Sequence, residues 1–191
     1  TINEIEEIKK ATIRKKLAEY AAIFDAHLAM LADPTLKRTI NEFIEERKVV
    51  AEHAVSRSFR RYISRMEQID EEYLSQRADD LRDLERRIIN NLAGAEPLKL
   101  EDIEEEVILI SRMLTPGETA LLPKDKVAGI ATDYGAQTSH ASLIARAMEI
   151  PAVVGLREVS NHVSSGDKVI VDGSHGEVII SPDEKAVEKY T

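Results

Sequence analysis

One histidine in this 191-residue sequence stands in a setting that could do chemistry. His140 follows Thr138 and Ser139, and a short turn of small residues at 135–137 precedes them. Apolar residues recur at helical spacing after it, so we predict a helix over 139–148 with Thr138 as its N-cap. A helix start offers unpaired backbone N–H groups and the positive end of the macrodipole, which favour a bound phosphoryl group. The spacing therefore indicates a phosphohistidine site.

The chemistry expected of His140 is nucleophilic. A neutral imidazole offers one nitrogen lone pair for attack, while its other nitrogen donates a hydrogen bond to an orienting acceptor. Arg146 could anchor an acidic loop or reach the phosphate. The residues alone leave an alternative open, in which a histidine after Thr-Ser is only part of a capping arrangement. The hydroxyl groups that could accept from the imidazole or bind phosphate oxygens belong to Thr119, Thr138, Ser139 and Ser142.

Composition limits the other classes of function. The chain has no Cys and no Trp, and its formal net charge is −9. Without cysteine there are no disulfides and no thiolate chemistry, and a zinc site would need His and carboxylate ligands alone. An acidic chain with few aromatic residues lacks the basic surface and stacking platforms that nucleic acids require. No apolar run approaches a membrane span and no signal peptide is visible, so we expect a cytoplasmic protein without membrane insertion.

The elements that must position His140 differ between the two halves of the chain. Residues 1–92 contain one Pro and no Gly, with apolar residues at helical spacing, which predicts an all-α bundle of four helices. Asp33 is expected to cap the second helix, with Pro34 at its first position, and Asp70 to cap the fourth. The stripes expected inside are Ile2, Ile5, Ile8, Ile13, Leu17, Ala21, Phe24, Leu28 and Leu31, then Leu36, Ile40, Phe43 and Ile44, then Val55, Phe59, Tyr62, Ile63 and Met66, and last Leu74, Ala78, Leu81, Leu84, Ile88 and Leu92.

From about residue 104 the pattern changes to short apolar runs bounded by Gly, Pro and Asp, which predicts alternating strands and helices. The fold class expected is α+β, with a helical subdomain at 1–94 and an α/β subdomain at 95–191. This second half is also the acidic one, because residues 93–191 carry 9 Lys and Arg against 17 Asp and Glu. The elements expected there are strands at 107–111, 127–132, 152–154, 168–171 and 177–180, and helices at 117–122, 139–148 and 182–190.

The run from Thr132 to Arg146 resembles the phosphohistidine signature of phosphoenolpyruvate-utilising enzymes, whose usual form is Gly-Gly-x-Thr-Ser-His followed by Ala-Arg. Three further stretches resemble Enzyme I of the bacterial phosphotransferase system, and together they span nearly the whole chain. They are residues 22–27 (Ala-Ile-Phe-Asp-Ala-His), residues 70–74 with Arg82-Asp83, and residues 106–109 followed by 114–120. A related dikinase or synthase shares the histidine segment but is not expected to carry the helical half.

The resemblance implies a phosphoryl relay through a swivelling α/β domain. Enzyme I is a phosphotransferase that takes phosphate from phosphoenolpyruvate onto one histidine and passes it to the small carrier protein HPr. His140 matches the phosphorylated residue, and Thr119 matches a threonine that hydrogen-bonds it. The helical half is implied to bind HPr through positions that match Glu19, His27, Met30, Leu36, Met66 and Arg77.

The resemblance also implies what this chain does not do alone. In full-length relatives a C-terminal domain binds phosphoenolpyruvate and Mg²⁺ and forms the homodimer. We therefore expect no cofactor in this chain, no charging by phosphoenolpyruvate alone, and a monomeric fragment.

Two residues depart from the signature. Its second Gly is Ala136, and Gln137 stands where sugar-system relatives commonly have a basic residue. Loss of a nearby cation should disfavour the phosphorylated state by about 1 kcal/mol. The alternative is that Gln137 marks a nitrogen-related branch, whose partner is a paralogue of HPr. Two rivals from other classes are the swivelling domain of a pyruvate-phosphate dikinase or phosphoenolpyruvate synthase, and an interaction module in which His140 is structural.

The remaining histidines and one basic stripe match no functional position. His53, His162 and His175 are expected at the surface or in loops, with His175 in a hairpin turn. The stripe is expected to be solvated, paired with Glu52 and Glu67, or in contact with a partner. It consists of Arg57, Arg61 and Arg65, with Arg60 beside it.

Overall fold

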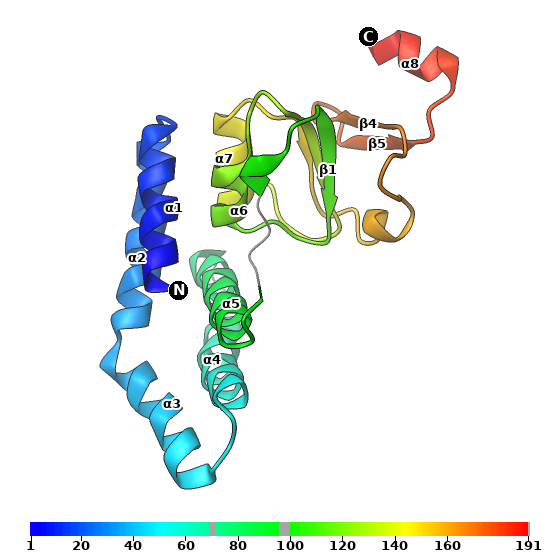
Figure 1. Ribbon diagram of the computed structural model, residues 1–191. Coiled ribbons are helices and arrows are strands. Elements are labelled where there is room, and N and C mark those ends of the chain that lie inside the picture. Colours follow the sequence, from blue (N-terminus) through cyan, green and yellow to red (C-terminus); the bar gives the residue numbers. More distant parts are fainter. Residues whose placement is uncertain (69–71, 96–99, 191) are drawn as a thin grey trace. The chain divides into compact units, whose positions relative to one another are not determined.

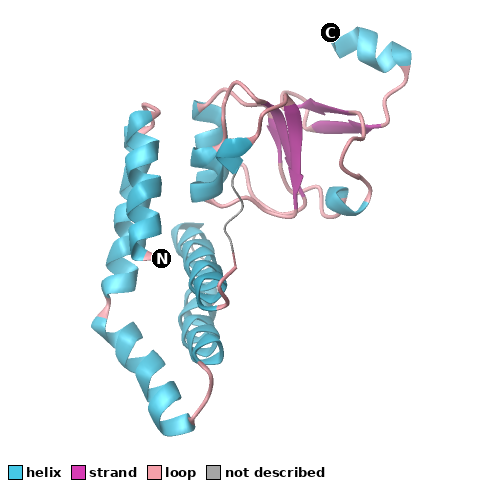
Figure 2. Cartoon of the chain, in the orientation of Figure 1, coloured by secondary structure: helices cyan, strands magenta, loops and turns pink. Residues whose placement is uncertain are grey.

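The computed structural model describes residues 1–68, 72–95 and 100–190, and the chain forms two compact units, Thr1–Leu98 and Lys99–Thr191. The described part of the first unit contains helices only, whereas the second contains strands and helices (Figure 1 and Figure 2). Among the described residues, no helix combines the length and the hydropathy that a membrane span requires. The helices of the first unit are α1 (Ile2–Arg14), α2 (Ala21–Ala32), α3 (Pro34–Arg47), α4 (Ala51–Glu67) and α5 (Glu72–Leu92), with a short 3-10 turn at Ala18–Tyr20.

The first predicted helix is in fact two helices. The apolar stripe over 2–31 predicted one helix, but α1 ends at Arg14 and α2 begins at Ala21. Lys16 adopts a positive φ of 62°, and its backbone N–H donates to the carbonyl of Ile13 at 3.0 Å. A left-handed residue of this kind ends a helix. The apolar residues on both sides of the break still face the core, so periodicity alone could not reveal it.

The other predicted stripes of the helical unit pack inside with few exceptions. The N-cap prediction at Asp33 is confirmed, because its carboxylate accepts from the N–H of Thr35 at 2.7 Å. Ile2, Ile13 and Leu92 are 47%, 48% and 46% exposed, so their predicted burial is wrong. Asp70 and the side chain of Leu74 lie outside the described residues. The predicted residues that are buried are Ile5, Ile8, Leu17, Ala21, Phe24, Leu31, Leu36, Val55, Phe59, Ile63, Ala78, Leu81 and Leu84.

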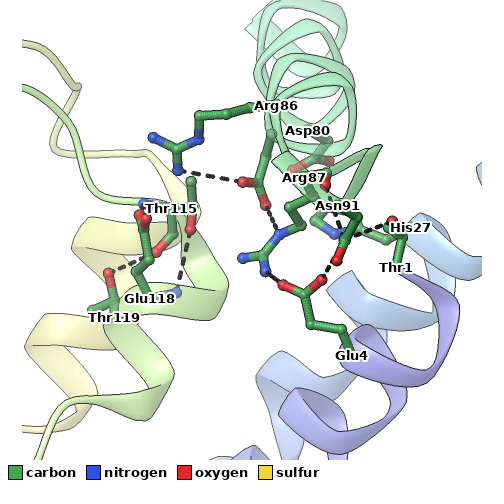
Figure 3. Close-up of polar contacts among 11 residues, drawn as sticks. Thr1, Glu4, His27, Asp80, Arg86, Arg87, Asn91, Thr115, Glu118 and Thr119 are labelled. Atoms are coloured by element: carbon green, nitrogen blue, oxygen red, sulfur yellow. Dashed lines mark hydrogen bonds and ion pairs between the residues drawn. The ribbon is translucent and has the colours of Figure 1, made fainter. Parts of the chain in front are cut away.

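A polar cluster ties α1 to α5 at the edge of this core (Figure 3). Arg87 donates to Asp83 through Nε at 3.0 Å and to Glu4 through Nη1 at 2.5 Å. The side chains of Asp83 and Arg87 are 4% and 11% exposed. Burial alone would lower the pKa of Arg87, but the two carboxylates outweigh burial and raise that pKa. Asn91 also donates to Glu4, at 3.0 Å, so the cluster joins helices far apart in the sequence.

The second unit is built on a parallel three-stranded sheet. Its order is β1 (Val107–Ser111), β2 (Val127–Thr132) and β3 (Ala152–Val153). Helix α6 (Pro116–Leu121) connects β1 to β2, and α7 (His140–Ala147) connects β2 to β3, as parallel pairing requires. The predicted mixture of helices and strands is confirmed, and element ends differ by at most two residues. The remaining elements are the 3-10 turns Leu100–Asp102 and Val159–Asn161, the antiparallel strands β4 (Val169–Asp172) and β5 (Glu177–Ile180), and α8 (Glu184–Tyr190).

The turn between β4 and β5 is organised by Asp172, and it contains His175 as predicted. The Asp172 carboxylate accepts from the backbone N–H groups of Ser174 at 2.9 Å and His175 at 3.0 Å. The Nδ1 atom of His175 lies 2.8 Å from the second carboxylate oxygen. These hydrogen bonds, the side-chain contact with His175 first, lower the pKa of Asp172 to about 2.

We expect Asp172→Asn to destabilise the second unit at neutral pH and to destabilise it less in acid. A carboxylate whose folded-state pKa is depressed contributes stability above its ordinary pKa of 3.8, and loses it as the pH falls through about 2. The difference in Tm between the wild type and Asp172→Asn should therefore be constant above about pH 5 and shrink toward pH 2. Thermal unfolding followed by circular dichroism measures this difference. A difference that stayed constant down to pH 2 would contradict the assignment.

Candidate functional site

His140 is the first residue of α7, so the structure places it in the first helical turn as predicted. The N-cap, however, is Ser139 and not Thr138, because Ser139 has extended backbone angles and its Oγ accepts from the N–H of Ser142 at 3.3 Å. Two adjacent residues that both cap helices well cannot be told apart by type alone. The N–H of Ser139 donates to the carbonyl of Ala136 at 3.0 Å. This turn ends at Ser139, so the helix begins after Ser139 and not after Thr138.

A chain of hydroxyl groups fixes this helix start to the loop before it. The Oγ of Ser139 donates to the Oγ of Ser142 at 3.0 Å, and the Oγ of Ser142 donates to the carbonyl of Ala136 at 2.8 Å. The backbone that carries His140 is thus held on both sides of the imidazole. A preorganised helix start of this kind suits an anion, since the amides and the macrodipole favour negative charge there.

We expect Ser139→Ala to lower the free energy of unfolding of the second unit by about 1 kcal/mol, the usual cost of removing a helix N-cap. The substitution removes the acceptor of the Ser142 N–H and one end of the hydroxyl chain. Thr138→Ala is the matched control, and it should cost less because Thr138 does not cap α7. Urea denaturation of the two variants measures the difference. An equal loss of unfolding free energy in both variants would contradict the assignment of the N-cap to Ser139.

Thr119 lies on α6, whose start is a complete capping box (Figure 3). Thr115 and Glu118 satisfy each other's backbone N–H groups, at 3.2 Å and 2.8 Å. Thr119 is buried, with 1% of its surface exposed. Its hydroxyl donates a hydrogen bond to the carbonyl of Thr115 at 2.9 Å. A hydroxyl oxygen that donates its hydrogen still has lone pairs to accept with. Thr119 can therefore accept a hydrogen bond from an imidazole N–H, and this contact stays a prediction.

The structure brings some of the predicted site residues together and not others. Thr119, Ser139 and Ser142 line one hollow between α6, α7 and the end of β2. Thr138 is exposed, and Arg146 is exposed in the last turn of α7, at the end opposite His140. Arg146 is therefore placed to interact with the C-terminal carbonyls of α7. Its contact with a phosphoryl group stays a prediction.

Two features that hold the histidine segment were missed in the sequence. Asp133, at the end of β2, is 3% exposed and accepts from the backbone N–H of Ser160 at 2.9 Å and from its hydroxyl at 2.5 Å. The hydroxyl contact lowers the pKa of Asp133. Next to it, the Arg112 guanidinium lies over the Tyr134 ring at 5.8 Å from the centroid. Both contacts join separate elements, and neither leaves a periodic signal in the sequence.

The proposed partner-binding positions are not all at the surface. Glu19 is exposed, and Met30, Met66 and Arg77 are half-buried. His27 and Leu36 are only 1% and 5% exposed, so their side chains offer little area to a partner, and partner binding at the six positions stays a prediction.

The burial of His27 has a direct cause. Its Nε2 lies 3.2 Å from a carboxylate oxygen of Asp80, which is 3% exposed, and its ring meets the edge of Phe24 with centroids 5.9 Å apart. His27 therefore joins α2 to α5 inside the helical unit. Helical spacing from Phe24 and Leu31 was the signal that could have placed His27 in the core.

The two units match separate parts of one family. Residues 1–77 match the family described as "PEP-utilising enzyme, N-terminal", and residues 103–176 match "PEP-utilising enzyme, mobile domain". The phosphoenolpyruvate-protein phosphotransferase of Geobacillus stearothermophilus is 43% identical over 98% of this chain, and that of Bacillus subtilis (strain 168) is 40% identical over 98%. The chain spans about a third of these relatives, 32% and 33% of their length.

Two solved structures are similar over nearly the whole chain. One is the solution structure of an Enzyme I protein called nEIt, with 48% identity and a TM-score of 0.77, covering 99% of this chain and 76% of that one. The other is the N-terminal domain of a nitrogen Enzyme 1, with 32% identity and a TM-score of 0.59, at the same coverage. The histidine site and both units thus have counterparts in the same proteins, and the chain belongs to the Enzyme I family of phosphoenolpyruvate-utilising enzymes, in which it corresponds to the N-terminal domain.

Proposed function

We propose that His140 carries a phosphoryl group from phosphoenolpyruvate to the carrier protein HPr. The observation that carries this proposal is the position of His140 at the start of α7, in a segment that matches the mobile domain of phosphoenolpyruvate-utilising enzymes. Because the chain spans about a third of its curated relatives, we assign the binding of phosphoenolpyruvate and Mg²⁺ to residues outside it. The chain itself needs no cofactor for the transfer to HPr.

The transfer proceeds by in-line attack of one imidazole nitrogen of His140 on phosphorus. An N–P bond forms as the P–O bond to the enolate of pyruvate breaks, and the other ring nitrogen keeps its hydrogen. In this proposal Thr119 accepts that hydrogen bond and orients the ring, while Ser139 caps the helix start and Thr138 precedes it. In the second step a histidine nitrogen of HPr attacks the same phosphorus and the N–P bond of His140 breaks. Such loose transition states need positioning and charge stabilisation more than covalent help.

The helical unit serves as the docking surface for HPr in this proposal. Of the six positions that match the family, Glu19, Met30, Met66 and Arg77 have side chains available at the surface. The match of residues 1–77 to the N-terminal family argues against a dikinase, which is not expected to have this helical half. The higher identity with nEIt than with the nitrogen enzyme favours HPr over its nitrogen-branch paralogue. We place the protein in the cytoplasm, with a homodimer for the full-length form.

Phosphoryl acceptance tests the proposal directly. HPr is phosphorylated by a full-length Enzyme I, separated from that enzyme, and mixed with this chain. We expect one acid-labile, base-stable phosphoryl group on the peptide that contains His140, and none when the chain meets phosphoenolpyruvate and Mg²⁺ alone. A phosphoryl group on another peptide, or on no peptide, would refute the proposal.

A further inference from the structure

Arg112 and Tyr134 form a pair of exposed side chains in the α/β unit that the proposed transfer does not use. Arg112 directly follows β1, and Tyr134 lies two residues after β2. The Arg112 guanidinium lies over the Tyr134 ring, 5.8 Å from its centroid, and Tyr134 is 52% exposed. The pair therefore stands at the carboxyl edge of the parallel sheet, the edge at which open α/β sheets bind their ligands.

The backbone fixes this pair beside the hollow that Thr119 and Ser139 line. The N–H of Tyr134 donates to the carbonyl of Arg112 at 2.9 Å. The carbonyl of Tyr134 accepts from the hydroxyl of Thr132 at 2.8 Å. Tyr134 itself lines the hollow, and the contact with its ring orders the guanidinium without neutralising it. Arg112 is thus an ordered positive charge next to the hollow.

The elements around the hollow supply no other positive side chain close to His140. Ser139 and Ala141, the neighbours of His140 in the chain, both line the hollow, and none of its described lining residues is charged. Residues 133–139 and helix α6 contain no Lys or Arg. The single cation of α7 is Arg146, in the last turn. A transferring phosphoryl group spreads negative charge over its oxygens, and the transfer is favoured by a cation placed to meet that charge.

Acidic side chains leave the charge of Arg112 available. Asp133 lies beside Arg112 in the sheet, since the residues before them, Ser111 and Thr132, are paired. Both carboxylate oxygens of Asp133 accept from Ser160. Within the part of the chain that the structure describes, Arg112 forms no ion pair. The hydrogen bonds from Ser160 chiefly, and the charge of Arg112 to a smaller extent, lower the pKa of Asp133.

We propose that Arg112 binds the phosphoryl group that His140 carries, and that Tyr134 positions the guanidinium for this contact. A guanidinium can donate two parallel hydrogen bonds to phosphoryl oxygens. Arg112 forms no covalent bond and moves no proton in this role. It stabilises negative charge during the transfer and on the phosphorylated histidine. This inference rests on the proposed function.

Replacement of Arg112 tests the inference. Phosphorylated HPr, separated from the enzyme that charged it, is mixed with each variant, and intact-protein mass gives the rate and final extent of labelling. Arg112→Gln should lower the rate by about 100-fold and shift the equilibrium toward phosphorylated HPr by about 10-fold. Arg112→Lys keeps the charge but not the paired hydrogen bonds, so both of its values should lie between those of the wild type and Arg112→Gln.

Lys168→Gln is the matched control for the charge. It removes one positive charge from an exposed position of the same unit. Its labelling rate and equilibrium should stay within about 3-fold of the wild type. An effect in Lys168→Gln as large as that in Arg112→Gln would overturn the inference, because net charge alone would then explain the loss.

Two substitutions of Tyr134 test the positioning role. Tyr134→Phe keeps a ring under the guanidinium and should be labelled at the wild-type rate. Tyr134→Ala removes the ring and should lower the rate by about 2- to 5-fold. A wild-type rate in Tyr134→Ala would overturn the role of the ring and the placement of Arg112 inferred from it.

Binding and folding measurements exclude a role in docking or stability. Isothermal titration calorimetry with unphosphorylated HPr should give Kd values within about 3-fold of the wild type for Arg112→Gln, because no phosphoryl group is present. Its Tm should stay close to that of the wild type, because the side chain is exposed. A loss of HPr affinity as large as the loss of labelling rate would make Arg112 a docking residue and overturn the inference.

The outcomes separate this inference from the proposed function. If Arg112→Gln is labelled at His140 at the wild-type rate and to the wild-type extent, the inference fails and the proposed function stands. If phosphorylated HPr does not label the wild type at all, the proposed function fails and the inference fails with it.

Discussion

Replacing His140 by glutamine is expected to abolish phosphoryl acceptance while leaving the fold intact. In the proposed transfer the imidazole nitrogen is the nucleophile, and a glutamine amide at the same place has no comparable lone pair. The rate of labelling by phosphorylated HPr should fall by more than about 1000-fold, which corresponds to about 4 kcal/mol of transition-state stabilisation. His140 is half-buried at the first position of α7 and outside the buried core, so the Tm should change little.

His162→Gln is the matched control for this experiment. The side chain of His162 is 61% exposed, and it has no place in the hydroxyl cluster around α7. The control should therefore be labelled at the wild-type rate. Full labelling of His140→Gln would show that another residue carries the phosphate, and an equal loss in both variants would show a general effect of histidine removal. Binding of HPr should persist in His140→Gln, because the proposed docking surface lies on the helical unit.

The largest expected effect on stability comes from Arg87→Met. Methionine keeps much of the aliphatic length of arginine but removes the hydrogen bonds to Asp83 and Glu4. The carboxylate of Asp83 is 4% exposed and would be left largely uncompensated, since Arg86 lies at 3.6 Å and is 41% exposed. Breaking a buried ion pair in this way costs about 3–5 kcal/mol. At about 4–8 °C per kcal/mol for a unit of this size, the Tm of the helical unit should fall by at least about 12 °C.

Arg82→Met on the same helix is the control for that loss. Arg82 pairs with Glu67 and Asp79, but these side chains are 50% and 60% exposed, so water and salt screen the pairs. Its loss should cost less than about 1 kcal/mol. Thermal unfolding by far-ultraviolet circular dichroism measures both variants. Equal shifts in Tm for the two variants would mean that the buried ion pair of Arg87 contributes no more to stability than the exposed pairs of Arg82.

The sequence predicted the helices and strands of this fold better than the points at which helices break or end. Periodicity identified both helical and α/β regions because burial of apolar residues dictates it. It missed the break at Lys16, since one left-handed residue leaves the apolar spacing on either side unchanged. It also predicted burial for Leu92, the last residue of α5, whose side chain is 46% exposed.

At the candidate site, contacts between residues close in the sequence were predictable, whereas contacts between distant residues were not. The position of His140 in a helix start was predictable because capping depends on neighbouring residues. The bond between Asp133 and Ser160 was not, because it joins residues 27 positions apart that share no pattern. For His27 the resemblance suggested a surface role, and only the packing against Phe24 and Asp80 shows it to be buried.

The anchoring of the histidine segment limits which part of the proposed relay can move. Hydrogen bonds hold Asp133 before the segment and Ser139 at the start of α7. The backbone on both sides of His140 is therefore fixed within the α/β unit. In the proposed transfer, the donor and the carrier must then reach the imidazole in turn, either by movement of the whole α/β unit or by exchange of the docked molecule.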